Sequence, residues 1–198
     1  MATLSSKKTG LFFGSFNPIH VGHLIIANHL VEHTDLDEIW FVISPHSPFK
    51  KKASLLADHH RYALVNYAVE DNSKLWASNI EFGLTQPSYT SHTLSFLEEK
   101  YPMKEFALIM GEDNIVHLDK WKNYQFILDN YSIYVYPRPG INLSKFHGHP
   151  SIKIITDVPK LEISSSFIRH NIREGKDVRY LLPERVYRYV KEMHFYTH

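Results

Sequence analysis

The stretch Gly14-Ser-Phe-Asn-Pro-Ile-His-Val-Gly-His23 decides most of what this chain can be. An apolar segment, Leu11-Phe12-Phe13, precedes it, and an apolar helical run from Leu24 to Val31 follows. This order predicts a strand, a tight turn and the start of a helix, with His20 and His23 at the N-terminus of that helix. In an α/β protein that position offers unpaired backbone N–H groups and the positive end of the helix dipole, which favour the phosphates of a nucleotide.

The residue types inside the turn fit this interpretation. Gly14 and Gly22 have no Cβ, so the backbone can approach a ligand closely or adopt a positive φ. Pro18 fixes its own φ and restricts Asn17 to extended conformations. Ser15 and the N–H groups near it can donate hydrogen bonds to phosphate oxygens. The turn is therefore predicted to hold a phosphate group.

His20 and His23 are three residues apart and share one face if both lie in the first helical turn. Two imidazoles at that place can contact a triphosphate and stabilise charge that develops during phosphoryl transfer. The alternative is a strand–turn–helix corner with histidines as polar caps. A zinc site is disfavoured because the chain has no cysteine and two histidines alone cannot complete a tetrahedral site, so we expect no metal ligands from the protein.

Composition limits the class of protein. The 198 residues predict one domain spanning residues 1–198, and a hydrophobic content of 43% is typical of a globular fold. The net charge of +1 gives no reason to expect nucleic acid or an anionic membrane as a partner. Without cysteines there are no disulfides, and the first eight residues lack the apolar core of a signal peptide. A cytoplasmic protein is expected.

Apolar segments that favour strands alternate with longer helical patterns along the chain. Strands are predicted at 10–13, 38–43, 75–78, 105–110, 132–136 and 153–156, and helices at 22–33, 58–71, 91–101, 114–118, 124–129, 164–174 and 183–193. Strands separated by helices imply right-handed crossovers and a parallel sheet covered on both faces. The predicted fold is α/β, a Rossmann-like, doubly wound parallel sheet.

Ligands of such sheets bind beyond the carboxyl ends of the strands. Five polar segments follow predicted strands and should meet at that edge, namely 14–23, 45–52, 111–113, 138–140 and 163–169.

In this order and at this spacing, the motifs resemble the nucleotidyltransferase superfamily with an HxGH signature, and within it the bacterial nicotinate-nucleotide adenylyltransferases. The resemblance covers nearly the whole chain and rests on residues 11–23, Pro87-Ser-Tyr-Thr90, Gly111-Glu-Asp113 through Trp121, Arg138-Pro-Gly140 and Ile163–Arg169. It implies transfer of AMP from ATP to nicotinate mononucleotide with Mg²⁺ as cofactor, giving the dinucleotide and pyrophosphate. ATP and nicotinate mononucleotide are the expected partners, and self-association into a homo-oligomer is left open.

The resemblance assigns roles residue by residue. Catalysis falls to His20, His23 and Arg169. ATP binding falls to Gly14, Ser15, Phe16, His20, His23, Gly111, Asp113, Ile163, Ser164, Ser165, Ser166 and Arg169. Mononucleotide binding falls to Ser15, Lys50, Arg61, Tyr89, Thr90, Trp121 and Arg138. Trp121 would stack on the pyridine ring, and Tyr89 and Thr90 would meet the nicotinate carboxylate.

Other interpretations stay open at this point. Trp121 could be a core residue, Asp113 a helix cap, and Ser164–Ser166 only an N-cap, although a serine-rich cap and an anion site are the same structure. Asn17 stands where many members have Asp, which puts a carboxylate role at the turn in doubt. The alternative functions are adenylyl or cytidylyl transfer to another phosphate acceptor and a non-catalytic nucleotide-binding module. A nicotinamide acceptor also stays open.

Overall fold

The computed structural model describes residues 6–45, 55–138, 146 and 148–197. Its centre is a six-stranded parallel sheet in the order β3-β2-β1-β4-β5-β6. The strands are β1 (Lys7–Gly14), β2 (Glu38–Ile43), β3 (Leu75–Ser78), β4 (Lys104–Gly111), β5 (Ser132–Tyr136) and β6 (Ile152–Ile154). The strand order reverses between β1 and β4, which confirms the predicted doubly wound α/β fold.

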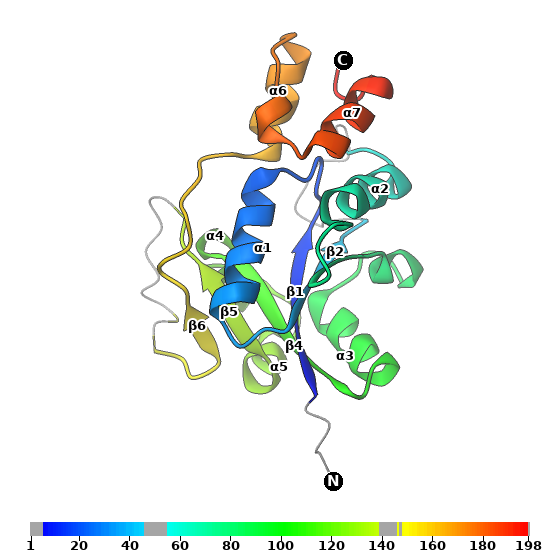
Figure 1. Cartoon of the computed structure of the whole chain (residues 1–198). Helices are drawn as coiled ribbons and strands as arrows, with labels where there is room; N and C mark the ends of the chain where they lie inside the picture. The colour runs from blue at the N-terminus through cyan, green and yellow to red at the C-terminus, as the bar shows by residue number, and fades with distance from the viewer. Residues whose placement is uncertain (1–5, 46–54, 139–145, 147, 198) are drawn as a thin grey trace.

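The longer helices are α1 (Val21–His33), α2 (Asp58–Val69), α3 (Thr90–Lys100), α5 (Tyr124–Asn130), α6 (Ser165–Arg173) and α7 (Glu184–Glu192). Shorter helical turns are η2 (Ile80–Gly83), α4 (Glu112–Ile115), η3 (Leu118–Lys120) and η4 (Arg179–Leu181). Figure 1 shows α6 and α7 beyond the end of β1 toward which its arrow points, near the C-terminus, while the N-terminus lies at the opposite end. Within the described residues, no helix has both the length and the apolar character needed to cross a bilayer.

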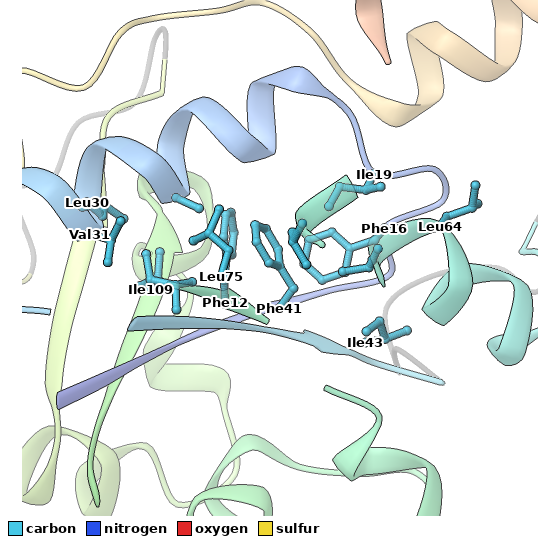
Figure 2. Close-up of a cluster of buried hydrophobic side chains, with 14 of the residues drawn as sticks. Phe12, Phe16, Ile19, Leu30, Val31, Phe41, Ile43, Leu64, Leu75 and Ile109 are labelled. Carbon is cyan, nitrogen blue, oxygen red and sulfur yellow. The ribbon is translucent and has the colours of Figure 1, made fainter. Parts of the chain in front are cut away.

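Successive side chains of each strand point to opposite faces of the sheet, and both faces are buried. On β1, Phe12 joins the core under α1, α2, α6 and α7, whereas Leu11 joins the core under α3 and α5. Figure 2 shows the first of these cores, in which Phe12 and Phe41 lie between the sheet and α1. Their ring centroids are 5.5 Å apart, so the two rings stack between β1 and β2 and the helix whose N-cap is His20.

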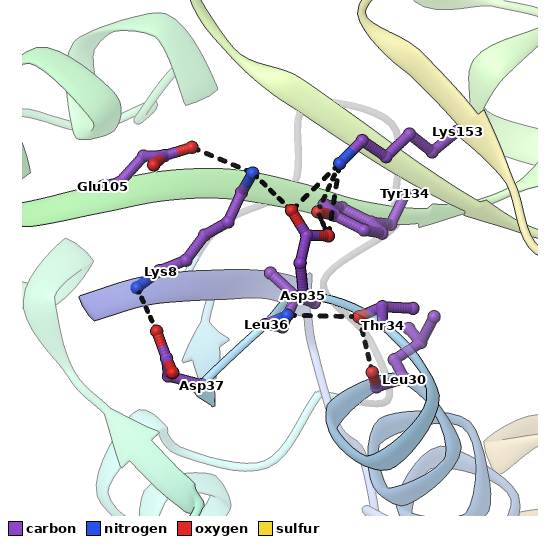
Figure 3. Close-up of polar contacts among 9 residues, drawn as sticks. All are labelled: Lys8, Leu30, Thr34, Asp35, Leu36, Asp37, Glu105, Tyr134 and Lys153. Atoms are coloured by element: carbon purple, nitrogen blue, oxygen red, sulfur yellow. Dashed lines mark hydrogen bonds and ion pairs between the residues drawn. The ribbon is translucent and has the colours of Figure 1, made fainter. Parts of the chain in front are cut away.

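A polar network lies near the amino ends of the strands, away from the edge predicted to bind ligands (Figure 3). Asp35, which follows α1, accepts hydrogen bonds from the Tyr134 hydroxyl and from the ammonium groups of Lys8 and Lys153, at 3.0 and 3.1 Å for the two lysines. Lys8 also pairs with Glu105 at 2.9 Å. β1 begins at Lys7, three residues before the predicted apolar start, because residues 7 and 8 already pair with β4 and the Lys8 ammonium has carboxylate partners.

Candidate active site

The turn that joins β1 to α1, residues 14–20, is built around one buried phenylalanine. Phe16 is 2% exposed and has a φ of 43°, a left-handed conformation that is rare for residues with a side chain. A Cβ on Gly14 would lie 2.8 Å from the Phe16 ring. Of the two alternatives expected at the glycines, a positive φ is not found at Gly14 or Gly22: Gly14 makes room for a ring, and Phe16 takes the left-handed conformation.

His20 and His23 lie face to face at the start of α1. Their ring centroids are 3.7 Å apart and the planes are inclined by 29°. The backbone N–H of His20 donates to Nδ1 of His23 at 3.3 Å, and the N–H of His23 donates to the carbonyl of His20 at 3.0 Å. A Cβ on Gly22 would lie 3.1 Å from the His20 ring, so this glycine leaves the space in which the ring sits.

The environment of His20 keeps its imidazole neutral near pH 7. The residue is 4% exposed, and burial, followed by the positive charge of Arg138, lowers the pKa of His20 to about 4. Its buried Nδ1 has no hydrogen-bond partner among the described residues. The contact of His20 with phosphate stays a prediction.

Both histidines line an open pocket at the carboxyl edge of the sheet. The pocket joins the start of α1, the end of β5 and the segment before α6, three places that are far apart in the sequence. Its walls include His20, Gly22, His23, Ile26, Tyr136, Pro137, Arg138, Val158, Pro159, Lys160, Leu161 and Ile163. Four predicted site residues, His20, His23, Arg138 and Ile163, thus meet at one place.

The serines before and in α6 dock that helix against the β1–α1 turn. Ser164 is the N-cap, and its Oγ accepts the N–H of Phe167 at 3.1 Å. The Ser165 hydroxyl donates to the carbonyl of Pro18 at 2.8 Å. Arg169 donates to the carbonyl of Asn17 at 2.7 Å and to the Ser166 hydroxyl at 3.2 Å. The predicted N-cap is present, and Arg169 braces the turn; its contact with phosphate stays a prediction.

The segment after β4 holds Arg138 in place. Glu112, which is buried, accepts the backbone N–H of Arg138 at 2.7 Å through Oε2. The Arg138 guanidinium lies 3.7 Å from the carboxylate of Asp113. The carboxylate of Asp113 lies over Gly111, where its Oδ1 occupies the space that a Cβ would take. The predicted ribose contact of Asp113 stays a prediction.

The predicted pyridine-binding residues lie on other elements and do not line this pocket. Tyr89 is the N-cap residue of α3, and Thr90 is its first residue. Trp121 follows η3 and is half-buried against the core under α3 and α5. The ammonium of Lys122 lies 4.5 Å from the centroid of the Tyr89 ring, which brings the two segments together.

Arg61 is buried inside the protein, which does not agree with its predicted contact with substrate. The residue is 0% exposed although it carries a guanidinium. It donates to the carbonyls of Ser15 at 2.7 Å, Ser44 at 3.0 Å and Leu56 at 3.0 Å, and pairs with Asp58 at 2.5 Å. Arg61 therefore supports the β1–α1 turn from the protein interior. The predicted contact of Lys50 falls outside the described residues.

Two groups of residues escaped the sequence analysis. Val158, Pro159, Lys160 and Leu161 line the pocket, and their position directly before the 163–169 motif was the available signal. Tyr196 donates its hydroxyl to Oδ1 of Asn17 at 2.8 Å, across 179 positions of sequence, and no motif marks it. Throughout the described part of the chain, no three His, Asp or Glu side chains are grouped so that they could hold a metal ion.

Comparison with known proteins places this geometry in a family. Residues 11–171 match the cytidylyltransferase-like family. The chain is 53% identical over 193 residues to a probable nicotinate-nucleotide adenylyltransferase of Christiangramia forsetii, covering 96% of this chain and 99% of that protein. A protein of the same name from Flavobacterium johnsoniae is 54% identical over 191 residues, with coverage of 96% and 98%.

A solved structure shares the fold. Nicotinic acid mononucleotide adenylyltransferase of Plasmodium falciparum, complexed with NaAD, superposes with a TM-score of 0.82 over 96% of this chain and 98% of that chain. Its sequence identity is 22%, so this likeness concerns the fold alone. Together with the much higher identity of the two bacterial relatives, the match over residues 11–171 identifies the chain as a member of the cytidylyltransferase-like family, on the branch of the nicotinate-nucleotide adenylyltransferases.

Proposed function

We propose that this chain transfers AMP from ATP to nicotinate mononucleotide, a step of NAD biosynthesis. The supporting observation is the pair of stacked imidazoles of His20 and His23, which share one pocket with Arg138 at the N-terminus of α1. The names of the close relatives point to the same acceptor.

The reaction is an in-line displacement at phosphorus. A phosphate oxygen of the mononucleotide forms a bond to the α-phosphorus of ATP, while the bond from that phosphorus to the bridging oxygen breaks and pyrophosphate leaves. The attacking phosphate is already anionic at pH 7, so no general base is required. Catalysis then depends on aligning the substrates and on stabilising charge on the α-phosphate and the leaving group.

The residues at the pocket match this requirement. Neutral His20 can donate one N–H to a phosphate oxygen, and an adjacent triphosphate would raise its pKa and favour the charged form. Arg138 and Lys160 add positive charge to the same walls. Tight packing of His20 between His23 and Gly22 keeps its ring in one orientation, which lowers the cost of reorganisation during the reaction.

Mg²⁺ is proposed to arrive with ATP. The pocket is lined by imidazoles and cations, a donor set that suits phosphate oxygens and does not suit a resident hard cation. Bound through the triphosphate, Mg²⁺ would neutralise charge on the phosphate oxygens. The protein's part is to hold those oxygens with its own N–H groups and cationic side chains.

The acceptor is proposed to bind over Trp121, with its carboxylate toward the first turn of α3 at Tyr89 and Thr90. A helix N-terminus favours a carboxylate over a neutral amide because its N–H groups and dipole attract negative charge. Lys122, held over the Tyr89 ring, adds a positive charge to the same region. These features support nicotinate over nicotinamide as the acceptor base.

The test is pyrophosphate release from ATP and Mg²⁺ with nicotinate mononucleotide and nicotinamide mononucleotide compared side by side. A strong preference for the acid is expected. A preference for the amide would overturn the acceptor assignment and leave the chemistry in place. Absence of release with both, combined with turnover on another phosphate acceptor such as phosphopantetheine, would replace the proposal by the broader family activity.

A further inference from the structure

The carbonyl oxygens of the β1–α1 turn are engaged by donors from distant parts of the chain. The backbone N–H of Ser44 donates to the carbonyl of Gly14 at 2.9 Å, and the Arg61 guanidinium donates to that of Ser15 at 2.7 Å. The Arg169 guanidinium donates to the carbonyl of Asn17 at 2.7 Å, and the Ser165 hydroxyl donates to that of Pro18 at 2.8 Å. A free carbonyl would repel a phosphate. Turning these oxygens toward the protein makes the turn more suitable for an anion.

Tyr196 contributes a further donor to this turn, and it comes from the last residues of the chain. Its hydroxyl donates to Oδ1 of Asn17 at 2.8 Å, and the same oxygen accepts the N–H of Leu56 at 3.2 Å. Asn17 is 3% exposed, so the contact lies inside the protein. Asn17 is therefore held at two places: its side-chain oxygen accepts from Tyr196 and Leu56, and its backbone carbonyl accepts from Arg169.

The segment that carries Tyr196 is itself fixed in an unusual conformation. Tyr196 has a φ of 66°, in the left-handed region that L-residues rarely adopt. The preceding Phe195 packs against His60 and Tyr189, with ring centroids 4.8 and 5.7 Å away. Contacts of this kind allow a left-handed residue to persist, and such residues concentrate at functional sites.

We propose that Tyr196 is a positioning residue of the active site, which fixes the β1–α1 turn through Asn17 so that His20 points correctly at the phosphates. The proposal rests on the proposed function for its chemistry. Asn17 lies three residues before His20, next to the left-handed Phe16, so a shift of Asn17 moves the histidine. A displacement of about 1 Å at a reacting group can cost a factor of roughly 10² in rate. A single hydroxyl outside the pocket therefore affects turnover.

The test compares two hydroxyl deletions in the same part of the chain. Tyr196→Phe removes the donor to Asn17. Tyr189→Phe is the matched control, because its hydroxyl bonds Nδ1 of His60 at 2.9 Å and does not reach the turn. For both variants, kcat, the KM for ATP, the dissociation constant for ATP and the thermal midpoint are measured. Tyr196→Phe is expected to lower kcat/KM for ATP by about tenfold, whereas the two variants lose similar stability.

Asn17→Leu provides a second comparison, because it removes the acceptor while keeping the branched shape of the side chain. In that background, Tyr196→Phe is expected to cause little further loss of kcat/KM, since Tyr196 acts on the turn through the oxygen that is already missing. Activity of Tyr196→Phe equal to that of Tyr189→Phe would overturn the proposal. So would a loss of activity that follows the loss of stability in both variants.

Measuring the affinity for ATP without an acceptor tests the role of Tyr196 independently of the proposed acceptor. If the unchanged protein fails to use nicotinate mononucleotide, the acceptor assignment fails, yet the ATP affinities of the two variants still test Tyr196. Tyr196→Phe is then expected to weaken ATP binding several-fold relative to Tyr189→Phe. Equal ATP affinities, together with equal turnover on whichever acceptor is used, would show that the tyrosine only stabilises the fold.

Discussion

The imidazole of His20 lies next to the Cα of Gly22, on the side where other residues carry a Cβ. An added Cβ would lie 3.1 Å from the Cε1 and Nδ1 atoms of that ring. Gly22 is the second residue of α1, and glycine costs up to about 1 kcal/mol relative to alanine in a helix. With Val21 it separates the two stacked histidines in sequence. The geometry of His20 therefore depends on the missing side chain of its neighbour.

Gly22→Ala is expected to lower kcat by about tenfold or more, because the methyl group must tilt the His20 ring away from its place. The thermal midpoint should change little, since alanine favours the helix and offsets part of the crowding. Gly83→Ala is the control, because a Cβ there meets no atom within 4 Å. Equal activity of the two variants would contradict the packing argument.

His20→Ala is expected to lower kcat by a factor on the order of 10² or more through loss of charge stabilisation in the transition state. Pyrophosphate release measures the rate, and thermal unfolding measures the fold. His33→Ala, at the exposed end of the same helix, should keep full activity. If the loss of activity at His20 only matched a loss of folded protein, the histidine would be structural.

Acidification should reveal the burial of His20. Burial and Arg138 lower its pKa to about 4 in the folded protein, against about 6.5 in an unfolded chain. The unfolded state then binds the proton more readily, so folded stability should decrease as the pH falls from about 6.5 toward 4. NMR titration of the His20 ring should give the low pKa, and saturating ATP should raise it. A free-protein pKa near 6.5 would contradict the burial argument.

Trp121→Ala is expected to raise the KM for the mononucleotide by about tenfold or more, while the KM for ATP stays close to its original value. The size follows from aromatic stacking on a base, worth about 1–3 kcal/mol. Trp76→Ala is the control, since Trp76 is 52% exposed on β3. An unchanged KM for the mononucleotide would remove Trp121 from the site and leave it as a core residue.

Arg61→Met is expected to lower the free energy of unfolding by about 3–5 kcal/mol, because it leaves the Asp58 carboxylate and three carbonyl groups without their buried donor. Denaturant unfolding measures the loss. Arg188→Met breaks an exposed pair with Glu184 and should cost less than about 1 kcal/mol. A substrate-binding Arg61 would instead weaken mononucleotide binding at unchanged stability.

The fold could be predicted from the sequence where a continuous apolar run forms a buried strand. The bounds 38–43 and 132–136 agree with the buried strands β2 and β5, and 75–78 also agrees with the edge strand β3. The last strand was predicted at 153–156 and lies at Ile152–Ile154. The short helix predicted at 114–118 begins at Glu112, directly after β4, and is followed by the separate turn η3. In β6 and α4, which have three and four residues, periodicity alone did not fix the bounds.

The strand, turn and helix start around residues 14–23 could be predicted because one short motif contains them, and the phosphate contacts of its side chains stay predictions. Arg61 was misjudged because burial of a guanidinium depends on carbonyl groups at residues 15, 44 and 56, and their meeting is a property of the folded chain. Tyr196 was missed for the same reason, since 179 positions separate it from Asn17. Contacts of this range leave no local pattern.

The hydrogen bond between Asn17 and Tyr196 also has a consequence for biosynthesis. A ribosome makes the chain from its N-terminus, so the β1–α1 turn is synthesised 179 positions before its tyrosine partner. The turn therefore stays without this hydrogen bond while the intervening sheet and helices are being made. A nascent chain gains the Tyr196 contact only after residue 196 has left the ribosome.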